Sequence, residues 1–193
     1  MLLKFPDDIL SLILNEYLDN LKDQLNLFSS HNKFKHLKIN KLNAIQYKGS
    51  VIQNPILTQE IIEQPKFFNL KELNINGNRN ISNLNHLTKL TNLHAYHCDL
   101  KNFSIEKCLN IKRLNLITNN REVSQVRGCL NYRTLLIDFN FFTNLIELKI
   151  MGLYIKKDFI KNCFNLKYLT LTFNPLFNEL DIINLLNSIH NSN

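Results

Sequence analysis

A motif that returns about every 21 residues constrains the fold of this chain more than any other feature. Its copies read cysteine or phenylalanine, apolar or threonine, asparagine, apolar, any residue, any residue, leucine. They begin at Cys108, Cys129, Cys163, Phe67, Phe142 and, in a weaker form, Leu87. A fixed period of 20 to 30 residues is typical of stacked repeats, in which each unit buries its apolar side against the next.

The residues that follow extend these copies to the spacing Leu-x-x-Leu-x-Leu-x-x-Asn. Side chains alternate along a strand, so the Leu-x-Leu step predicts a short strand with one buried side. A single such strand cannot bury itself, and we expect the copies to stack as parallel strands with the Asn bonded to turn backbone of its own and the neighbouring repeat. The copies are Leu70-Leu73-Ile75-Asn78, Leu90-Leu93-Ala95-Cys98, Ile111-Leu114-Leu116-Asn119, Tyr132-Leu135-Ile137-Asn140 and Leu166-Leu169-Leu171-Asn174.

One irregular step interrupts the period. Successive copies start 20 or 21 residues apart, but only 13 residues separate the starts at 129 and 142. Thirteen residues are few for a strand, its return path and the next strand, since a parallel crossover takes a dozen or more residues. Either Leu135 to Ile137 or Leu148 to Ile150 is displaced from the stack, or the return path there is a bare extended loop.

Over residues 66 to 178 this pattern resembles the leucine-rich-repeat family. The resemblance implies an α/β solenoid, a stack of short parallel strands. We expect partner binding on the strand residues that face away from the core, because these form one continuous surface. The candidate residues are Glu72, Asn74, His94, Tyr96, Arg113, Asn115, Lys149, Tyr168 and Thr170.

The cysteines are interpreted as packing residues. Cys108, Cys129 and Cys163 share one position of the motif, where a small apolar side chain fills the core. With Cys98 they are expected to stay reduced, and we expect no metal site. His94, His97 and Cys98 lie close in sequence, but the strand alternation does not require them to converge.

Helices are predicted at the beginning of the chain. Pro6 with two acidic residues after it is typical of a helix start. The apolar stripe Ile9, Leu10, Ile13, Leu14, Tyr17 and Leu18 indicates one amphipathic helix. A second short helix carries Leu21, Leu25 and Phe28, and a third carries Phe34 and Leu37.

Residues 1–42 resemble the F-box module in the segments Phe5-Pro6-Asp7-Asp8-Ile9-Leu10, Ile13-Leu14, Tyr17-Leu18-Asp19, Leu25 and Ser29 to Lys35. The resemblance implies docking on the Skp-type adaptor of a cullin-type ubiquitin ligase, with an unknown protein substrate held by the repeats. The alternative is a plain helical cap on the first repeat. The partner-binding candidates are Phe5, Pro6, Ile9, Leu10, Leu14, Leu18, Leu25 and Phe34.

Two further segments complete the predicted organisation. Residues 43–66 are a connection or an irregular first repeat, in which Thr58 caps a helix carrying Ile61 and Ile62. Residues 67–193 hold the repeats and a C-terminal capping helix, predicted over residues 178–189 from its apolar spacing.

Composition narrows the function classes. The net charge is +7, but lysines and arginines are spread along the chain, so the basic stretch of residues 33–41 is read as a solvated face, with nucleic-acid binding as a weaker alternative. No phosphate loop, nucleophile elbow or zinc-protease motif occurs, and we expect neither enzymatic activity nor a cofactor. No signal peptide or membrane span is predicted, so we expect a cytoplasmic or nuclear protein that binds protein, with a free-standing repeat protein as the alternative to a ligase adaptor.

Overall fold

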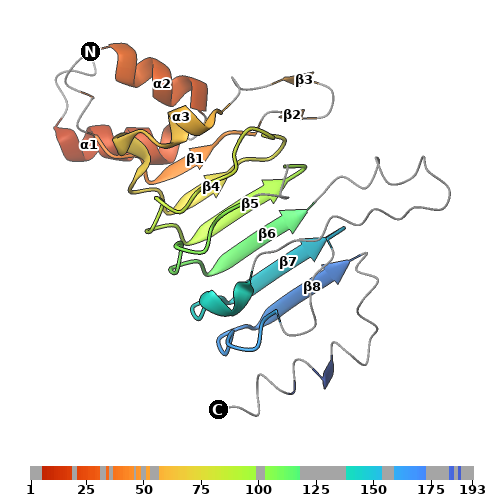
Figure 1. Cartoon of the computed structure of the whole chain (residues 1–193). Helices are drawn as coiled ribbons and strands as arrows, with labels where there is room; N and C mark the ends of the chain where they lie inside the picture. Colours follow the sequence, from red (N-terminus) through yellow and green to blue (C-terminus); the bar gives the residue numbers. More distant parts are fainter. Residues whose placement is uncertain are drawn as a thin grey trace.

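A parallel sheet of six strands is the main feature of the part of the chain that the structure describes (Figure 1). The structure is a computed structural model, and it describes residues 6–18, 21–30, 34, 37–45, 47–48, 51–52, 57–98, 103–117, 138–153, 159–172, 183–184 and 187. The strands in spatial order are β1 (Lys41–Asn43), β4 (Glu72–Asn74), β5 (Asn92–Tyr96), β6 (Arg113–Ile117), β7 (Glu147–Met151) and β8 (Tyr168–Thr172). Two short strands, β2 (Tyr47–Lys48) and β3 (Val51–Ile52), pair antiparallel beside this sheet.

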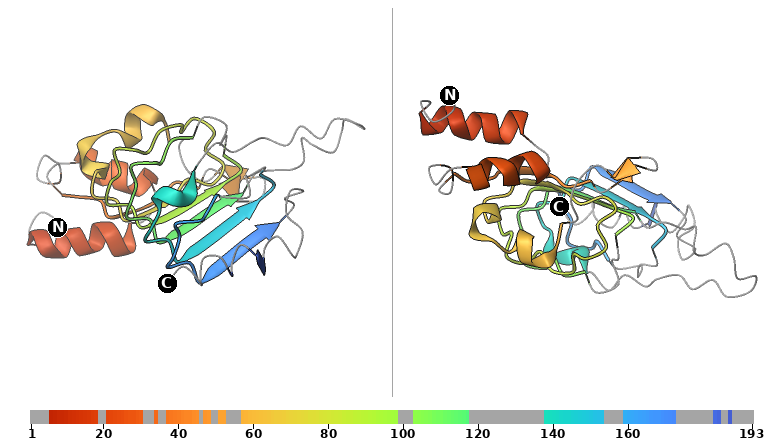
Figure 2. Two further views of the ribbon diagram at one scale, coloured as in Figure 1. Left: turned by 60° about the horizontal axis from the view of Figure 1, so that its bottom comes forward. Right: turned by 90° about the horizontal axis from the view of Figure 1, so that it is seen from above.

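The helices lie at the β1 end of the sheet and on one of its faces (Figure 2). Helix α1 (Asp7–Leu12) continues into a π-helical turn, η2 (Ile13–Tyr17), and is followed by α2 (Leu21–Ser30). These confirm the first two predicted helices. Of the third, Phe34 lies in a 3-10 turn, whereas Leu37 is not helical, so the predicted helix does not extend to Leu37. Short helices α3 (Gln59–Ile62), η4 (Pro65–Phe67) and η6 (Phe139–Phe141) belong to the segments that connect the strands.

The predicted alignment of apolar residues across parallel strands is confirmed. Each strand pairs in register with the next, which places one apolar residue of every strand in a single buried column. The column consists of Leu42, Leu73, Leu93, Leu114, Leu148 and Leu169. The first five are almost completely buried, and Leu169 at the end is partly buried. The strands therefore form an α/β arrangement whose core lies between the sheet and the connecting segments.

The sheet shows which of the two closely spaced copies, at 129 and 142, contributes a strand to the stack. Strand β6 pairs with β5 on one side and with β7 on the other, so Leu148 and Ile150 belong to the stack. No further strand stands between β6 and β7, and Leu135 to Ile137 lie outside the described residues. The connection from β6 to β7 is therefore longer than the connections from β4 to β5 or from β5 to β6.

Strand β1 was not predicted. It adds a strand to the edge of the sheet before the first recognised copy, and Leu42 joins the column beside Leu73. Ile39, Leu42 and Ala44 are all buried and repeat the spacing of Leu90, Leu93 and Ala95. The apolar spacing is thus present in the sequence, but without the phenylalanine or cysteine that marks the other copies.

In three described copies of the motif, the asparagine bonds its connecting segment to the one before it. The amide of Asn110 donates to the carbonyl of Thr88 at 2.7 Å, and the amide of Asn165 donates to the carbonyl of Thr143 at 2.8 Å. Asn144 donates to the Leu109 carbonyl at 3.2 Å. These hydrogen bonds give the motif's asparagine a structural function that the sequence analysis did not assign.

The second asparagine of the repeat behaves as predicted at Asn78, whereas Asn140, predicted for the same position in a later copy, lies in η6 and not directly after a strand that the structure describes. Asn78 is buried, donates to the carbonyls of Ala44 and Ile75, and accepts a hydrogen bond from the backbone N–H of Leu57 at 3.1 Å. It therefore joins its own repeat to the preceding strand. At the equivalent position Cys98 directs its thiol to the Ile75 carbonyl at 3.1 Å.

The predicted burial of the cysteines is confirmed for the three that are described. Cys98, Cys108 and Cys163 are free thiols in the core, and Cys129 lies outside the described residues. The Thr58 cap is also confirmed, because its hydroxyl accepts the N–H of Ile61. The predicted C-terminal helix is described only at residues 183, 184 and 187, which are helical. None of the helices in the described ranges has the length and apolar character needed to cross a bilayer.

Candidate functional site

The face of the sheet opposite the core carries three rows of side chains. Strand pairing places the outward residues of neighbouring strands side by side. The row at the strand beginnings is Lys41, Glu72, Asn92, Arg113, Glu147 and Tyr168; the middle row is Asn43, Asn74, His94, Asn115, Lys149 and Thr170; the row at the strand ends is Tyr96, Ile117, Met151 and Thr172. All nine strand residues predicted as partner-binding candidates lie in these rows, so the structure brings them together on one face, which we call the outer face.

Asn115 and His94 form the centre of the outer face. The two side chains are 2.9 Å apart, between Asn115 Nδ2 and His94 Nδ1, so the amide donates to a neutral ring that carries its proton on Nε2. Burial lowers the pKa of His94, and Arg113 adds to this, while the carboxylates of Glu147 and Glu72 act in the opposite direction. The neutral form needed for this hydrogen bond is therefore the favoured form near pH 7.

Two buried amide oxygens of the middle row have no donor within the described residues. These are the Oδ1 atoms of Asn115 and Asn43. Asn115 is only 6% exposed. A buried polar atom without a hydrogen bond costs about 1–3 kcal/mol, so these two oxygens lower the stability of the sheet.

The row at the strand beginnings is charged and open to solvent. Arg113 Nε and Glu147 Oε2 are 3.7 Å apart, with most of the arginine side chain exposed. An ion pair of this kind contributes only about 0–1 kcal/mol to stability. Tyr168, at 65% exposure, ends the row. Arginine and tyrosine are enriched among residues that dominate binding energies at interfaces.

The row at the strand ends is more apolar. Tyr96, Ile117 and Met151 are half-buried, and the rings of His94 and Tyr96 meet edge to face with centroids 6.2 Å apart. Burial raises the pKa of Tyr96, so its hydroxyl stays protonated and can donate a hydrogen bond. The outer face therefore changes from charged to apolar along the strand direction.

The F-box-like candidates divide between core and surface. Leu10, Leu14 and Phe34 are buried in the core of this chain, so their side chains pack internally and do not face a partner. Leu18 and Leu25 are partly buried against the same core. Pro6 and Ile9 are exposed, and Phe5 lies outside the described residues.

The structure also exposes apolar residues that were not partner-binding candidates, and one of them, Tyr17, was predicted in the apolar stripe of the first helix. Leu12 and Tyr17 are 50% and 75% exposed on α1 and η2. Phe68, Leu109 and Phe164 are exposed at one equivalent position of the repeated motif, directly before its asparagine. The sequence could have indicated this exposure, because the apolar residue stands next to an asparagine, a residue typical of turns at the surface.

The histidines and cysteine at 94–98 do not converge. His94 lies on the outer face, whereas the Cys98 thiol is buried and bonded to the Ile75 carbonyl. Within the described ranges there is no group of three or more His, Cys, Asp or Glu side chains placed to hold a metal ion.

Comparison with known proteins does not identify a family. Scanning the chain against protein-family models gives no match, and searching curated proteins gives none either.

Proposed function

We propose that this chain is a leucine-rich-repeat-like solenoid that binds another protein on its outer face. The observation that carries the proposal is the register of the sheet, which sets the outward side chains of β4 to β8 in continuous rows. Tyr168, Arg113 and Glu72 are exposed there. A mixture of exposed aromatic and charged side chains on a rigid sheet favours a specific protein partner.

A quantitative capture experiment tests this proposal. The purified chain is immobilised, and proteins retained from a cell lysate are quantified by mass spectrometry for the wild type and for Arg113→Glu with Tyr168→Ala. The matched control is Lys107→Glu with Leu109→Ala, which changes an exposed cation and an exposed apolar residue off the outer face. We expect a retained protein that is lost with the first variant and kept with the second; equal retention by both variants contradicts the proposal.

We further propose that the N-terminal helices dock a Skp-type adaptor, which makes the chain a substrate-recruiting subunit of a cullin-type ubiquitin ligase. The support is the F-box-like sequence pattern together with the exposure of Pro6, Ile9, Leu12 and Tyr17 on α1 and η2. Exposed apolar residues on a helix are a common means of docking a partner. The chain itself would then carry no chemistry, since ubiquitin transfer takes place elsewhere in such a ligase.

Adaptor binding separates this proposal from a free-standing repeat protein. A pull-down with a Skp-type adaptor compares the wild type with Pro6→Ala plus Ile9→Asp, and uses Leu109→Asp as a control at an exposed apolar residue of the repeats. We expect the wild type and Leu109→Asp to retain the adaptor and the double variant to lose it. A wild type that retains no adaptor leaves the free-standing repeat protein.

The nucleic-acid alternative has less support in the structure. Phe34, Leu37 and Ile39, the apolar residues interleaved with the lysines of residues 33–41, are all buried. They pack in the core and do not form a stacking surface for bases. Retention on DNA that falls steeply with salt would favour this alternative over protein binding.

A further inference from the structure

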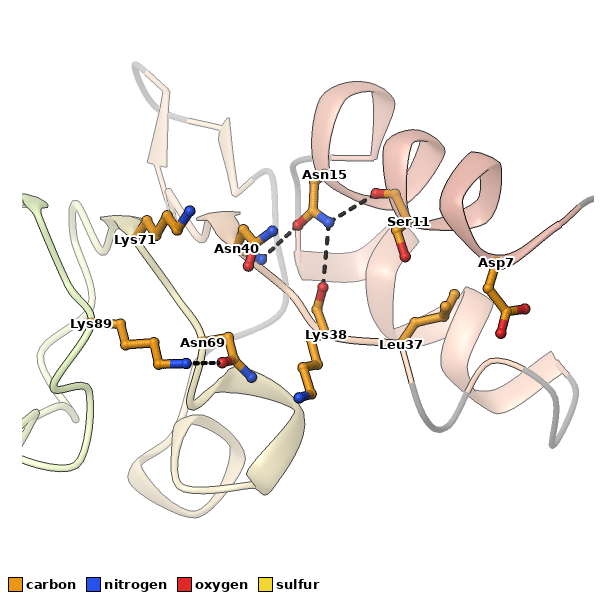
Figure 3. Close-up of a pocket in the computed structure, with 9 residues that line it drawn as sticks. All are labelled: Asp7, Ser11, Asn15, Leu37, Lys38, Asn40, Asn69, Lys71 and Lys89. Atoms are coloured by element: carbon orange, nitrogen blue, oxygen red, sulfur yellow. Dashed lines mark hydrogen bonds between the residues drawn. The ribbon is translucent and has the colours of Figure 1, made fainter.

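A pocket lies where the first helix meets the sheet (Figure 3). It has a volume of about 410 Å³, within the range of ligand-binding pockets. Residues of α1 and η2, of the segment 37–40 and of the turns before β4 and β5 line it. They are Asp7, Ser11, Asn15, Leu37, Lys38, Asn40, Asn69, Lys71 and Lys89.

Positive charge dominates this pocket. Three of its nine lining residues are lysines, and Asp7 is the single carboxylate among them. Figure 3 shows Lys71 and Lys89 extending from the sheet side and Lys38 from the segment before β1, beside the helix. Lys38 and Lys71 form no ion pair with any residue that the structure describes. Among the described residues that line the pocket, three positive charges therefore stand against one negative charge.

Neighbouring amides hold the walls of the pocket in place. Asn15 donates to the carbonyls of Ser11 and Lys38, at 2.8 and 3.3 Å, and accepts the backbone N–H of Asn40 at 2.6 Å. The bonds to Lys38 and Asn40 join the first helix to the segment that carries Lys38, and the bond to Ser11 lies within the helix. On the opposite side, the Lys89 ammonium donates to Asn69 Oδ1 at 2.8 Å. The ammonium group of Lys89 and the backbone of Lys38 are thus held in place before any ligand arrives, which reduces the entropy lost on binding.

We propose that this pocket binds a phosphate-bearing ligand. A phosphate monoester carries nearly two negative charges at neutral pH and presents three strong acceptor oxygens. Lysine ammonium groups on two sides of the pocket match that charge, and the side-chain amides of Asn40 and Asn69 add donors. A pocket of this volume also holds the carbon skeleton to which the phosphate is attached. The site is separate from the outer face and does not depend on the function proposed for it.

The phosphate can belong to a free small molecule or to a phosphorylated side chain of a partner protein. Both present the same dianion to Lys38, Lys71 and Lys89. Binding of inorganic phosphate, O-phosphoserine and a phosphoserine peptide with its unphosphorylated form distinguishes them. A peptide that binds much more tightly than O-phosphoserine indicates a partner protein, and equal binding indicates a small molecule.

Isothermal titration calorimetry on the full chain tests the site with these probes at constant ionic strength. We expect each of Lys38→Gln, Lys71→Gln and Lys89→Gln to weaken O-phosphoserine binding about three- to tenfold, and the triple variant to abolish it. The control is the double variant Lys112→Gln, Lys167→Gln, which removes exposed lysines at the same ends of β6 and β8 but outside the pocket. Thermal unfolding of each variant establishes that it is folded.

A gain of affinity provides a test that loss of folding cannot imitate. Asp7→Asn removes the carboxylate that lines the pocket, so we expect it to tighten O-phosphoserine binding about threefold. Three results overturn the proposal: no binding of any phosphate probe to the wild type, equal binding to the triple lysine variant, or an equal loss in the Lys112 and Lys167 control.

Discussion

At the scale of single residues, His97 has a left-handed backbone conformation, and two other repeats have a glycine at the same position. Its φ is 57°, and the residues at the equivalent place after β4 and β7 are Gly77 and Gly152, with φ of 82° and 71°. The N–H groups of all three donate to a carbonyl of the next strand. The position thus requires the left-handed conformation, which costs a residue with a Cβ atom about 1–2 kcal/mol.

We expect His97→Gly to stabilise the protein by about 0.5–1 kcal/mol, because the strain removed exceeds the entropy that glycine loses on folding. Urea unfolding followed by circular dichroism measures the change. Gly77→Ala is the reverse control and should destabilise the protein by about 1 kcal/mol. A loss of stability in His97→Gly would show that the imidazole makes a contact worth more than the strain.

The buried thiols lead to a prediction about alkaline pH. Burial raises the pKa of Cys98, Cys108 and Cys163 to about 12 from an ordinary value near 9. The unfolded chain therefore releases these protons at lower pH than the folded chain does. The stability that they contribute is complete below pH 9 and is lost progressively as the pH rises from 9 towards 12.

Two measurements check the thiol prediction. At pH 8 we expect iodoacetamide to leave these three cysteines unmodified in the folded protein and to modify them in urea, as read by peptide mass spectrometry. The free energy of unfolding should fall between pH 8 and pH 10, and fall less in Cys108→Ala with Cys163→Ala, relative to the value of that variant at pH 8. Rapid labelling of Cys108 without urea would contradict the packing role.

At the scale of elements, two kinds of asparagine join successive repeats, and they should differ in energy. Asn78→Ala leaves the buried Leu57 N–H and Ala44 carbonyl without their partner, so we expect a cost of about 2–4 kcal/mol. Asn110→Ala removes one exposed hydrogen bond to Thr88 and should cost about 1 kcal/mol. Urea unfolding measures the loss of unfolding free energy in both variants. Equal losses would show that burial does not determine the strength of these asparagine hydrogen bonds.

The repeated strands could be predicted from the sequence because each leucine position carries the same physical requirement. Leu73, Leu93 and Leu114 are aligned in the sheet as their spacing indicates. The strand that pairs with β6 could not be predicted from the sequence. Leu135 and Leu148 each end a copy of the motif, and both copies fit the repeat equally well. Pairing of β6 with β7 settles the position of Leu148.

For the candidate site as well, the sequence pattern predicted which side chains face outward but not how they pack. Alternation along the strands correctly placed Glu72, Arg113 and Tyr168 on the outer face. It could not show that Asn115 is almost fully buried there, because that burial comes from side chains of neighbouring strands. The pocket around Lys38, Lys71 and Lys89 was not predicted either, since residues distant in sequence meet there only after folding.

At the scale of the whole molecule, each strand of the six-stranded sheet is hydrogen-bonded to the strands directly beside it, so stability should decrease from the middle of the stack to its end. Leu114 is completely buried between β5 and β7, whereas Leu169 on β8 is only partly buried. In stacked repeats the stability is close to a sum over units and their neighbour interfaces. A change in one strand should therefore act most strongly on the strands that flank it.

We expect Leu114→Ala to cost about 3–5 kcal/mol and Leu169→Ala about 1–2 kcal/mol, because the second side chain loses less buried area and leaves a smaller cavity. Amide hydrogen exchange should show reduced protection on β5, β6 and β7 in the first variant, and mainly on β7 and β8 in the second. If both variants instead lower protection evenly from β1 to β8, the sheet unfolds as one cooperative unit. That outcome would contradict an architecture whose strands are stabilised chiefly by their nearest neighbours.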